Sequence, residues 1–171
     1  MFDRLTRREF SLTLASAIGG TPWLLSRPTA TEEVTKTSEA IHQEVKLNAS
    51  GARVYAALTD ASQFTKLMAF SSMKNAPPAQ IASELGGPFS LFAGHIIGRQ
   101  LELVPAQRIV QAWRVVDWPV GVYSIARFEI ADRGGKAIIV FDHTGFPNGL
   151  GQHLAQGWRT NYWEPLRKYL D

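Results

Sequence analysis

The sequence contains no cysteine among its 171 residues. This absence excludes disulfide bonds, thiolate metal sites, a cysteine nucleophile and a lipidated cysteine anchor. Basic residues are scattered rather than gathered in a run, and the formal net charge is only +3. Proteins that bind nucleic acid concentrate such charge on one face, because they displace counterions from phosphates. A nucleic-acid partner is therefore not expected.

Motifs for common chemistries are also missing. The chain has neither the Gly-x-Ser-x-Gly turn that exposes a nucleophilic serine nor the Gly-x₄-Gly-Lys loop that holds phosphates. The histidines are His42, His95, His143 and His153, and no two of them have the His-x-His or His-x₃-His spacing of a local ligand pair. Neither a metal site nor a cofactor is predicted.

Apolar and aromatic residues, by contrast, are plentiful. Hydrophobic residues make up 45% of the chain, with five tryptophans, nine phenylalanines and four tyrosines. Each large aromatic ring buries on the order of 150–250 Å² when it packs inside a protein. The length suits one domain, of about 100–200 residues, with a short appendage.

The first thirty residues have the layout of an export signal. A charged start leads to Arg7, Arg8 and Phe10, and an apolar stretch follows at residues 12–25. The paired arginines resemble the twin-arginine type, which is recognised by a receptor of the export machinery. The stretch is shorter than the roughly 20 apolar residues that span a bilayer, so no stable membrane span is expected. The alternatives are an uncleaved signal, because residues 28–30 make a poor cleavage site, and an amphipathic end that docks on the domain.

Three regions follow from this layout. Residues 1–30 are predicted to be the twin-arginine-type signal segment, and the polar residues 31–40 a linker. Residues 41–171 form the predicted domain. The expected location is the periplasm or the exterior of the cell.

The domain begins with a strand and two short helices. Alternation of apolar and polar residues predicts a strand over residues 41–47. Ser50 is a suitable N-cap for a short helix, and Thr59 and Asp60 begin a second one. The segment between residues 76 and 88 is expected to be irregular.

A series of strands comes next, and a long helix closes the chain. Strands are predicted at 89–92, 96–104, 108–116, 123–131 and 136–143. The glycines of the Asp132-Arg133-Gly134-Gly135 turn favour a hairpin, so the sheet should be an antiparallel meander. Residues 149–170 are predicted to be helical, with an interruption near Asn161 and Tyr162 because Pro165 cannot donate a backbone hydrogen bond. The fold class is α+β, a curved antiparallel sheet wrapped around this helix.

This order of elements resembles the helix-grip fold of the START/SRPBCC superfamily, and within it the family named after the activator of Hsp90 ATPase. The matching pieces occur in the family's order at residues 54–60, 94–98, 103–114, 143–147 and 157–166. The resemblance implies a cavity that accommodates apolar small molecules in relatives, with a ligand that differs across the superfamily. It also implies a co-chaperone activity, which belongs to the cytosol and fits an export signal poorly.

Catalysis has one candidate pair, His143 beside Asp142 near the end of the last predicted strand. The plainer interpretation is a histidine that fixes the following turn by hydrogen bonds, since this pair lacks a nucleophile. The same interpretation applies to His95. We therefore predict no catalytic residue, and an enzyme of the cyclase or hydrolase kind that uses His143 and Asp142 remains an alternative.

The large aromatic side chains are the candidates for a binding site. Each of them can be explained by core packing alone, but together they could line a pocket between helix and sheet. Arg99 or Arg114 would supply a polar anchor only if its side chain points inward. The candidate lining residues are Phe92, His95, Trp113, Phe128, His143, Trp158 and Tyr162.

These observations lead to a first hypothesis of an exported, non-enzymatic domain that binds a small apolar molecule in a central cavity. The second hypothesis is the enzyme just described. The third is an interaction module that engages another protein through an exposed apolar surface, as a co-chaperone does.

Overall fold

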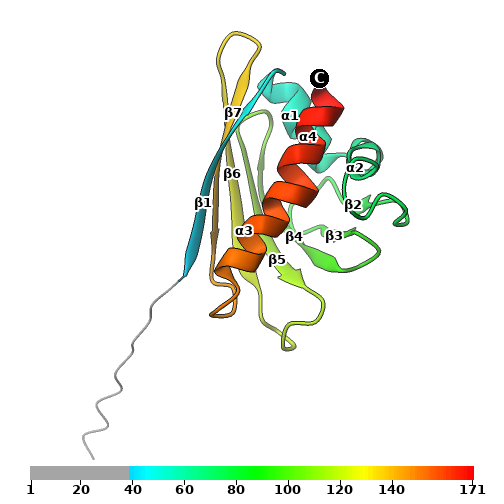
Figure 1. The fold of residues 1–171 in the computed structure, drawn as a ribbon, viewed down its shortest axis with the longest axis vertical. Coiled ribbons are helices and arrows are strands. Elements are labelled where there is room, and N and C mark those ends of the chain that lie inside the picture. Colours follow the sequence, from blue (N-terminus) through cyan, green and yellow to red (C-terminus); the bar gives the residue numbers. More distant parts are fainter. Residues whose placement is uncertain (1–38) are drawn as a thin grey trace, which may run out of the picture. The chain divides into compact units, whose positions relative to one another are not determined.

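The computed structural model describes residues 39–171, so the predicted signal segment and most of the linker lie outside the described residues. Seven antiparallel strands form one curved sheet in the order β1-β7-β6-β5-β4-β3-β2 (Figure 1). Their bounds are β1 Ala40–Leu47, β2 Gln80–Ile81, β3 Pro88–Leu91, β4 Ile96–Val104, β5 Arg108–Val115, β6 Ser124–Asp132 and β7 Ala137–Thr144.

The strands confirm the predicted meander. Strands β2 to β7 each pair with the next along the chain, and β1 joins the far edge by pairing with β7. The turn between β6 and β7 contains Gly134 and Gly135, with φ of 65° and 84°. The short strand β2 was not expected, because its two residues, Gln80 and Ile81, are too few to show alternation.

Two short helices follow β1 as predicted, and Ser50 caps the first of them as expected. Helix α1 (Gly51–Thr59) begins after Ser50, whose hydroxyl accepts from the Arg53 N–H. Helix α2 (Ala61–Met68) begins after Asp60, whose carboxylate accepts from the Gln63 N–H at 2.8 Å. Both caps occupy backbone donors that have no partner within the helix.

The C-terminal helix crosses the concave face of the sheet (Figure 1). It consists of α3 (Gly151–Trp158), a π-helical turn η1 (Arg159–Trp163) and α4 (Glu164–Leu170). In the π turn the Glu164 N–H donates to the Arg159 carbonyl, five residues back. Pro165 follows at once, and it has no N–H to give to the Asn161 carbonyl. The predicted interruption is therefore a widened turn.

The core lies between this helix and the sheet and is mostly aromatic. Trp158 of the helix packs against Phe141 of β7, with ring centroids 4.4 Å apart, and lies 5.3 Å from Trp113 of β5. Gly98 of β4 leaves room for another buried ring, since a β-carbon there would come within 2.3 Å of the Phe89 ring of β3. Most of the space under the helix is thus filled with side chains.

No helix among residues 39–171 is long and apolar enough to cross a membrane.

Candidate functional site

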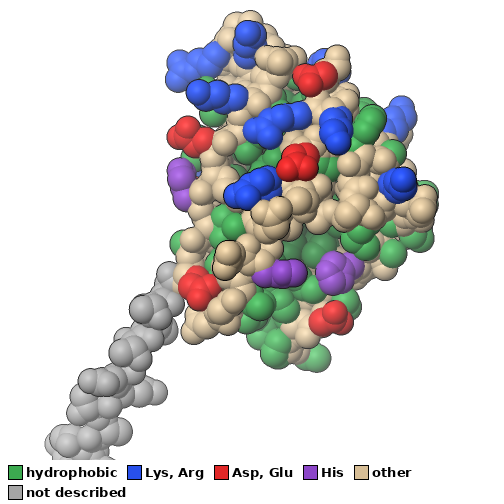
Figure 2. All heavy atoms as spheres, in the orientation of Figure 1, with side chains coloured by type: hydrophobic (Ala, Val, Ile, Leu, Met, Phe, Trp, Pro, Cys, Tyr) green, Lys and Arg blue, Asp and Glu red, His purple; other side chains and the backbone are tan. Residues whose placement is uncertain are grey.

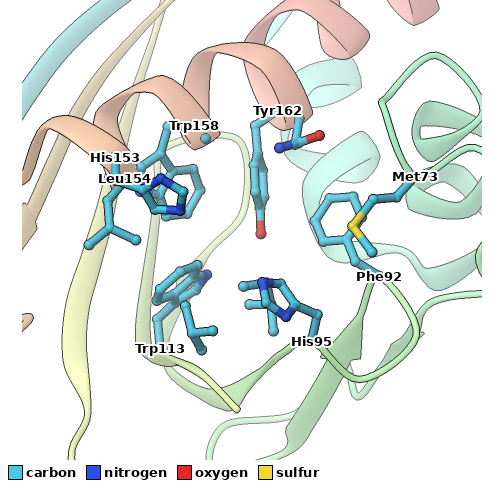
Figure 3. Close-up of a pocket in the computed structure, with 12 residues that line it drawn as sticks. Met73, Phe92, His95, Trp113, His153, Leu154, Trp158 and Tyr162 are labelled. Atoms are coloured by element: carbon cyan, nitrogen blue, oxygen red, sulfur yellow. The ribbon is translucent and has the colours of Figure 1, made fainter. Parts of the chain in front are cut away.

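A cavity of about 100 Å³ lies under the first half of the C-terminal helix (Figure 3). Its walls come from β4 and β5 below, from α3 and η1 above, and from the segments around Met73 and Phe92 at the side. The lining residues are Met73, Phe92, His95, Ile96, Trp113, Val115, His153, Leu154, Gly157, Trp158, Asn161 and Tyr162. None of these side chains is an acid, a lysine or an arginine.

The mouth of the cavity opens beside His95 and His153, which are both exposed. The face shown in Figure 2 is hollowed here, with apolar side chains around the hollow and histidines at its edge. Gly157 contributes to the opening, because a β-carbon built on it would meet no atom within 4 Å. The neighbouring Asn161 is held by the Ser72 hydroxyl, which donates to its side-chain oxygen at 2.6 Å.

Two buried polar atoms belong to this cavity and have no hydrogen-bond partner among the described residues. They are the indole nitrogen of Trp113 and the hydroxyl of Tyr162. Burial raises the pKa of the Tyr162 phenol, an effect that the nearby Trp113 indole partly opposes. The phenol therefore stays neutral. The Trp113 indole is near enough to act on the phenol as a hydrogen-bonding side chain, although the geometry between the two groups is not that of a normal hydrogen bond.

Five of the seven residues predicted from the sequence lie around this cavity: Phe92, His95, Trp113, Trp158 and Tyr162. The other two do not. Phe128 of β6 faces inward, but its ring lies 4.9 Å from Phe141 and 6.1 Å from Trp163 in the packed core. It borders only a second, much smaller space of about 10 Å³. Trp158 covers the position that Phe128 would need to reach the larger cavity.

His143 is completely buried behind Trp158. The Trp158 indole N–H donates to its Nδ1 at 2.9 Å, and its Nε2 lies 2.6 Å from the Ser124 hydroxyl. An indole nitrogen can only donate, so Nδ1 is an acceptor and the ring proton is on Nε2. Ser124 in turn donates to the Trp113 carbonyl at 2.8 Å. These three hydrogen bonds connect helix α3 to three strands, and we call the set Ser124, His143 and Trp158 the latch.

The latch holds a neutral imidazole. Burial lowers the pKa of His143 from 6.5 to about 3. Protonation would place a proton on Nδ1, where it would oppose the Trp158 N–H. The sequence predicted a histidine whose hydrogen bonds fix the following turn; the side chain is hydrogen-bonded, but its partners are Trp158 of α3 and Ser124 of β6 and not that turn.

Asp142 lies on the opposite face of β7 from His143. Its carboxylate accepts from the Nδ1 of His42 on β1 at 2.7 Å, on the exposed outer side of the sheet. The pair raises the pKa of His42 through this hydrogen bond and the charge of Asp142. His143 and Asp142 therefore cannot act together on one substrate. The geometry offers no support for the acid–base alternative.

Neither arginine considered from the sequence reaches the cavity. Arg99 is exposed and donates to the Gly86 carbonyl at 2.8 Å. Arg114 is buried, but its guanidinium holds the loop after β5 by donating to the carbonyls of Val116 and Trp118 at 3.1 and 2.5 Å. The Arg114 guanidinium therefore stabilises this loop and is not available to a ligand in the cavity.

Sequence reasoning missed several lining residues. His153, Gly157 and Asn161 recur every four residues along one face of the helix, and that spacing could have marked them. Met73 comes from a segment between α2 and β2 with no periodic pattern, so nothing in the sequence places it at the cavity. Among residues 39–171 there is also no cluster of three metal-ligating side chains.

Two other hollows are larger but shallower. They have volumes of about 320 and 250 Å³ and are open grooves along β2 and β3. Neither contains a buried polar atom without a partner. The cavity under the helix combines enclosure, aromatic walls and two side chains with unpaired polar atoms.

Comparison with known families gives one match that covers most of the chain. The model of the family "Activator of Hsp90 ATPase homolog 1-like protein" matches residues 48–171. The chain belongs to this family. The predicted family resemblance is confirmed, and the curved sheet with its long helix is the fold of this family's structural neighbours.

Curated relatives of this family member include the activator of 90 kDa heat shock protein ATPase homolog 1 of Homo sapiens, which is 29% identical over 53% of the chain. The corresponding homolog of Dictyostelium discoideum is 33% identical over 50% of the chain. The matches span only 27% and 22% of those relatives' own lengths.

Solved structures share the fold at low sequence identity. An Hsp90 activator from Plasmodium falciparum superimposes with a TM-score of 0.69 and 24% identity, over 77% of this chain and 95% of that one. CalU16 from Micromonospora echinospora gives a TM-score of 0.64 and 18% identity, over 78% of this chain and 77% of that one. These likenesses concern the fold alone.

Proposed function

We propose that this family member is exported to the periplasm or beyond and binds a small apolar molecule in the cavity under its C-terminal helix. The observation that carries the proposal is the cavity itself. It is mostly apolar, it is bordered by two buried aromatic side chains with unpaired polar atoms, and it opens to the surface. Such concave apolar sites with a few polar groups are the usual form of a small-molecule site.

The volume limits the size of the ligand. Pockets for drug-sized molecules usually measure about 300–1,000 Å³, whereas this cavity holds about 100 Å³. An engineered cavity of about 150 Å³ binds benzene. This cavity is smaller than that one, so a single ring or a short chain would have to leave part of itself in the open mouth.

The π turn supports the assignment of this region as the site. Such turns interrupt α-helices mostly at functional positions, because their weaker geometry is kept only for a purpose. Here the turn η1 supplies Asn161 and Tyr162 to the cavity wall. The Tyr162 side chain of this turn points into the space below the helix (Figure 3).

Ligand binding can be tested by thermal unfolding with toluene as the probe. A ligand present at ten times its dissociation constant stabilises a protein by about 1.4 kcal/mol, which raises the melting temperature of a domain of this size by roughly 4 °C. Gly157→Phe should abolish the shift, because it places a ring at an open position of the mouth. Lys168→Phe, on an exposed site of α4, is the control and should keep it. No shift with the unaltered protein would contradict the proposal.

Export can be tested separately. Replacing Arg7 and Arg8 by lysine keeps the charge but removes the paired arginines. We expect the variant to remain in the cytoplasmic fraction of its host while the unaltered chain is recovered outside it. Equal distribution of both proteins would contradict export by this route.

A second function, binding to a protein partner, is favoured by one surface. Val116, Val120 and Tyr123 of the loop between β5 and β6 are exposed, together with Ile125 at the start of β6. Apolar side chains gather at the end of the molecule where this loop lies (Figures 1 and 2). Val120→Glu should weaken a protein partner's binding and leave the toluene shift unchanged.

A further inference from the structure

Two buried polar atoms at the cavity have no hydrogen-bond partner among the described residues. Trp113 is 3% exposed and Tyr162 is 5% exposed, so water from the bulk does not reach their polar atoms directly. Neither the indole nitrogen nor the hydroxyl has a partner among the described residues. A buried polar group without a partner costs about 1–3 kcal/mol. Two such groups at one cavity need an explanation, since nearly all buried polar groups in native proteins are paired.

The two groups approach the cavity from opposite sides. The Tyr162 hydroxyl points down into the space from the helix, and the Trp113 ring lies across from it on the sheet (Figure 3). A ligand atom between them could interact with both. The Trp113 nitrogen can only donate a hydrogen bond, whereas the tyrosine hydroxyl can donate or accept.

Neither ring is free to turn its polar atom elsewhere. The Tyr162 ring packs edge-on against Phe64 and Phe92, with centroids 5.7 and 5.5 Å away. The Trp113 ring lies between Trp118, at 5.6 Å, and Trp158, at 5.3 Å. The polar atoms are thus held in place before any ligand arrives, which lowers the entropy that binding must overcome.

The charge of the ligand is limited by the walls. No acid, lysine or arginine lines the cavity, and the two histidines lie at its exposed mouth. Burying an ion without a partner of opposite charge costs far more than burying a neutral polar group. Only an uncharged ligand suits the interior.

We infer that the cavity selects a neutral, ring-sized molecule with one hydrogen-bond-accepting oxygen, such as a cyclic ketone, whose oxygen receives the Trp113 N–H and the Tyr162 O–H. This inference rests on the proposed function, which requires only that the cavity binds an apolar molecule. It adds the chemical class of the ligand and assigns a recognition role to each of the two residues. A carbonyl oxygen has two lone pairs and can accept both hydrogen bonds at once.

Three probes of similar size distinguish the effect of a hydrogen-bonding oxygen from the effect of ligand size. Cyclohexanone has the ring and the oxygen, toluene has a ring of matched size without it, and benzoate has a negative charge. Affinities are measured by titration of the purified full chain, followed in ¹H–¹⁵N spectra. Cyclohexanone should bind about tenfold more tightly than toluene, which is the effect of one or two hydrogen bonds in a buried site. Benzoate should not bind.

The indole N–H signal of Trp113 gives a direct readout of the hydrogen bond. It should move downfield with cyclohexanone and remain nearly unchanged with toluene. Tyr162→Phe removes only the hydroxyl, so it should weaken cyclohexanone binding several-fold and leave toluene binding equal or tighter. Tyr169→Phe, on the same helix but outside the cavity lining, is the matched control and should change neither.

The outcomes distinguish this inference from the proposed function. If toluene and cyclohexanone bind equally well and Tyr162→Phe affects them alike, the cavity binds apolar molecules but the two polar atoms do not select an oxygen. If none of the probes binds, both proposals fail. Tight binding of benzoate would overturn the requirement for a neutral ligand.

Discussion

Two sets of buried polar atoms lie side by side between the C-terminal helix and the sheet, and they differ in one respect. In the latch every polar side-chain atom has a partner: the indole of Trp158, both nitrogens of His143 and the hydroxyl of Ser124. At the cavity the indole of Trp113 and the hydroxyl of Tyr162 have none. Trp113 connects the two sets, because its backbone carbonyl accepts from Ser124 of the latch while its ring nitrogen remains unpaired at the cavity.

This difference distinguishes buried polar groups that stabilise the fold from buried polar groups that are available to bind a ligand. A paired buried group stabilises the fold, and its removal leaves the former partner unsatisfied. An unpaired buried group lowers stability by its desolvation cost, and it is available to a ligand. The same residue types, an indole and a hydrogen-bonding partner, therefore serve the fold on one side of Trp158 and a binding site on the other.

The largest expected effect comes from breaking the latch. His143→Ala removes a completely buried ring and leaves the Trp158 N–H without an acceptor. Loss of a large core side chain and of its hydrogen bonds should lower the free energy of unfolding by about 3–5 kcal/mol. The change is measured by urea denaturation. His42→Ala is the control, and it should have a much smaller effect because its ion pair with Asp142 is exposed to solvent. An equal decrease in the free energy of unfolding of the two variants would show that the latch stabilises the fold no more than an exposed ion pair does.

An intermediate effect should follow a change in pH. The pKa of His143 is lowered to about 3 in the folded protein, against about 6.5 in the unfolded chain. The unfolded state therefore binds more protons between these values, and the stability contributed by the neutral ring is fully present above pH 6.5 and is lost as the pH falls toward 3. Between pH 7 and pH 5 the loss should be about 2 kcal/mol.

The control for this pH dependence is His143→Gln, which removes the titrating group. The stability difference between this variant and the unaltered protein should shrink as the pH falls from 7 to 5. His42 acts in the opposite direction, because its raised pKa gives stability that is present at low pH and lost as the pH rises. A difference that stays constant with pH would contradict a neutral His143 in the fold.

Much of the fold could be predicted from the sequence because its signals are local. Alternation marks strand β1, the glycines after Asp132 mark the hairpin, and Ser50 and Asp60 mark the starts of helices. The two-residue strand β2 carries too little pattern to be recognised. The π turn could not be predicted either. The apolar residues of the C-terminal helix recur with the period of an α-helix, and this pattern does not show that the Glu164 N–H bonds to the carbonyl five residues back.

The site was predictable only in part, for a physical reason. Sequence shows that a residue is large and apolar, but which ring fills the core and which borders a cavity depends on distant neighbours. Phe128 and Trp113 both face inward, yet Trp158 and Trp163 cover the first and leave space beside the second. The bond from Trp158 to His143 likewise joins a helix to a strand and has no counterpart in sequence spacing.

The smallest expected effect gives the sharpest comparison, because it contrasts two deletions of a single hydroxyl. Ser124→Ala removes a paired hydroxyl and leaves the Nε2 proton of His143 without an acceptor, so the free energy of unfolding should fall by about 1–3 kcal/mol.

Tyr162→Phe removes a hydroxyl that is just as buried but has no partner, and the free energy of unfolding should change by less than about 0.5 kcal/mol or should rise. Both variants are measured by urea denaturation at pH 7, where His143 is neutral in the folded protein. A loss for Tyr162→Phe as large as that for Ser124→Ala would mean that the tyrosine hydroxyl already has a stabilising partner in the free protein. The cavity would then be a second latch, and its polar atoms would not be available to a ligand.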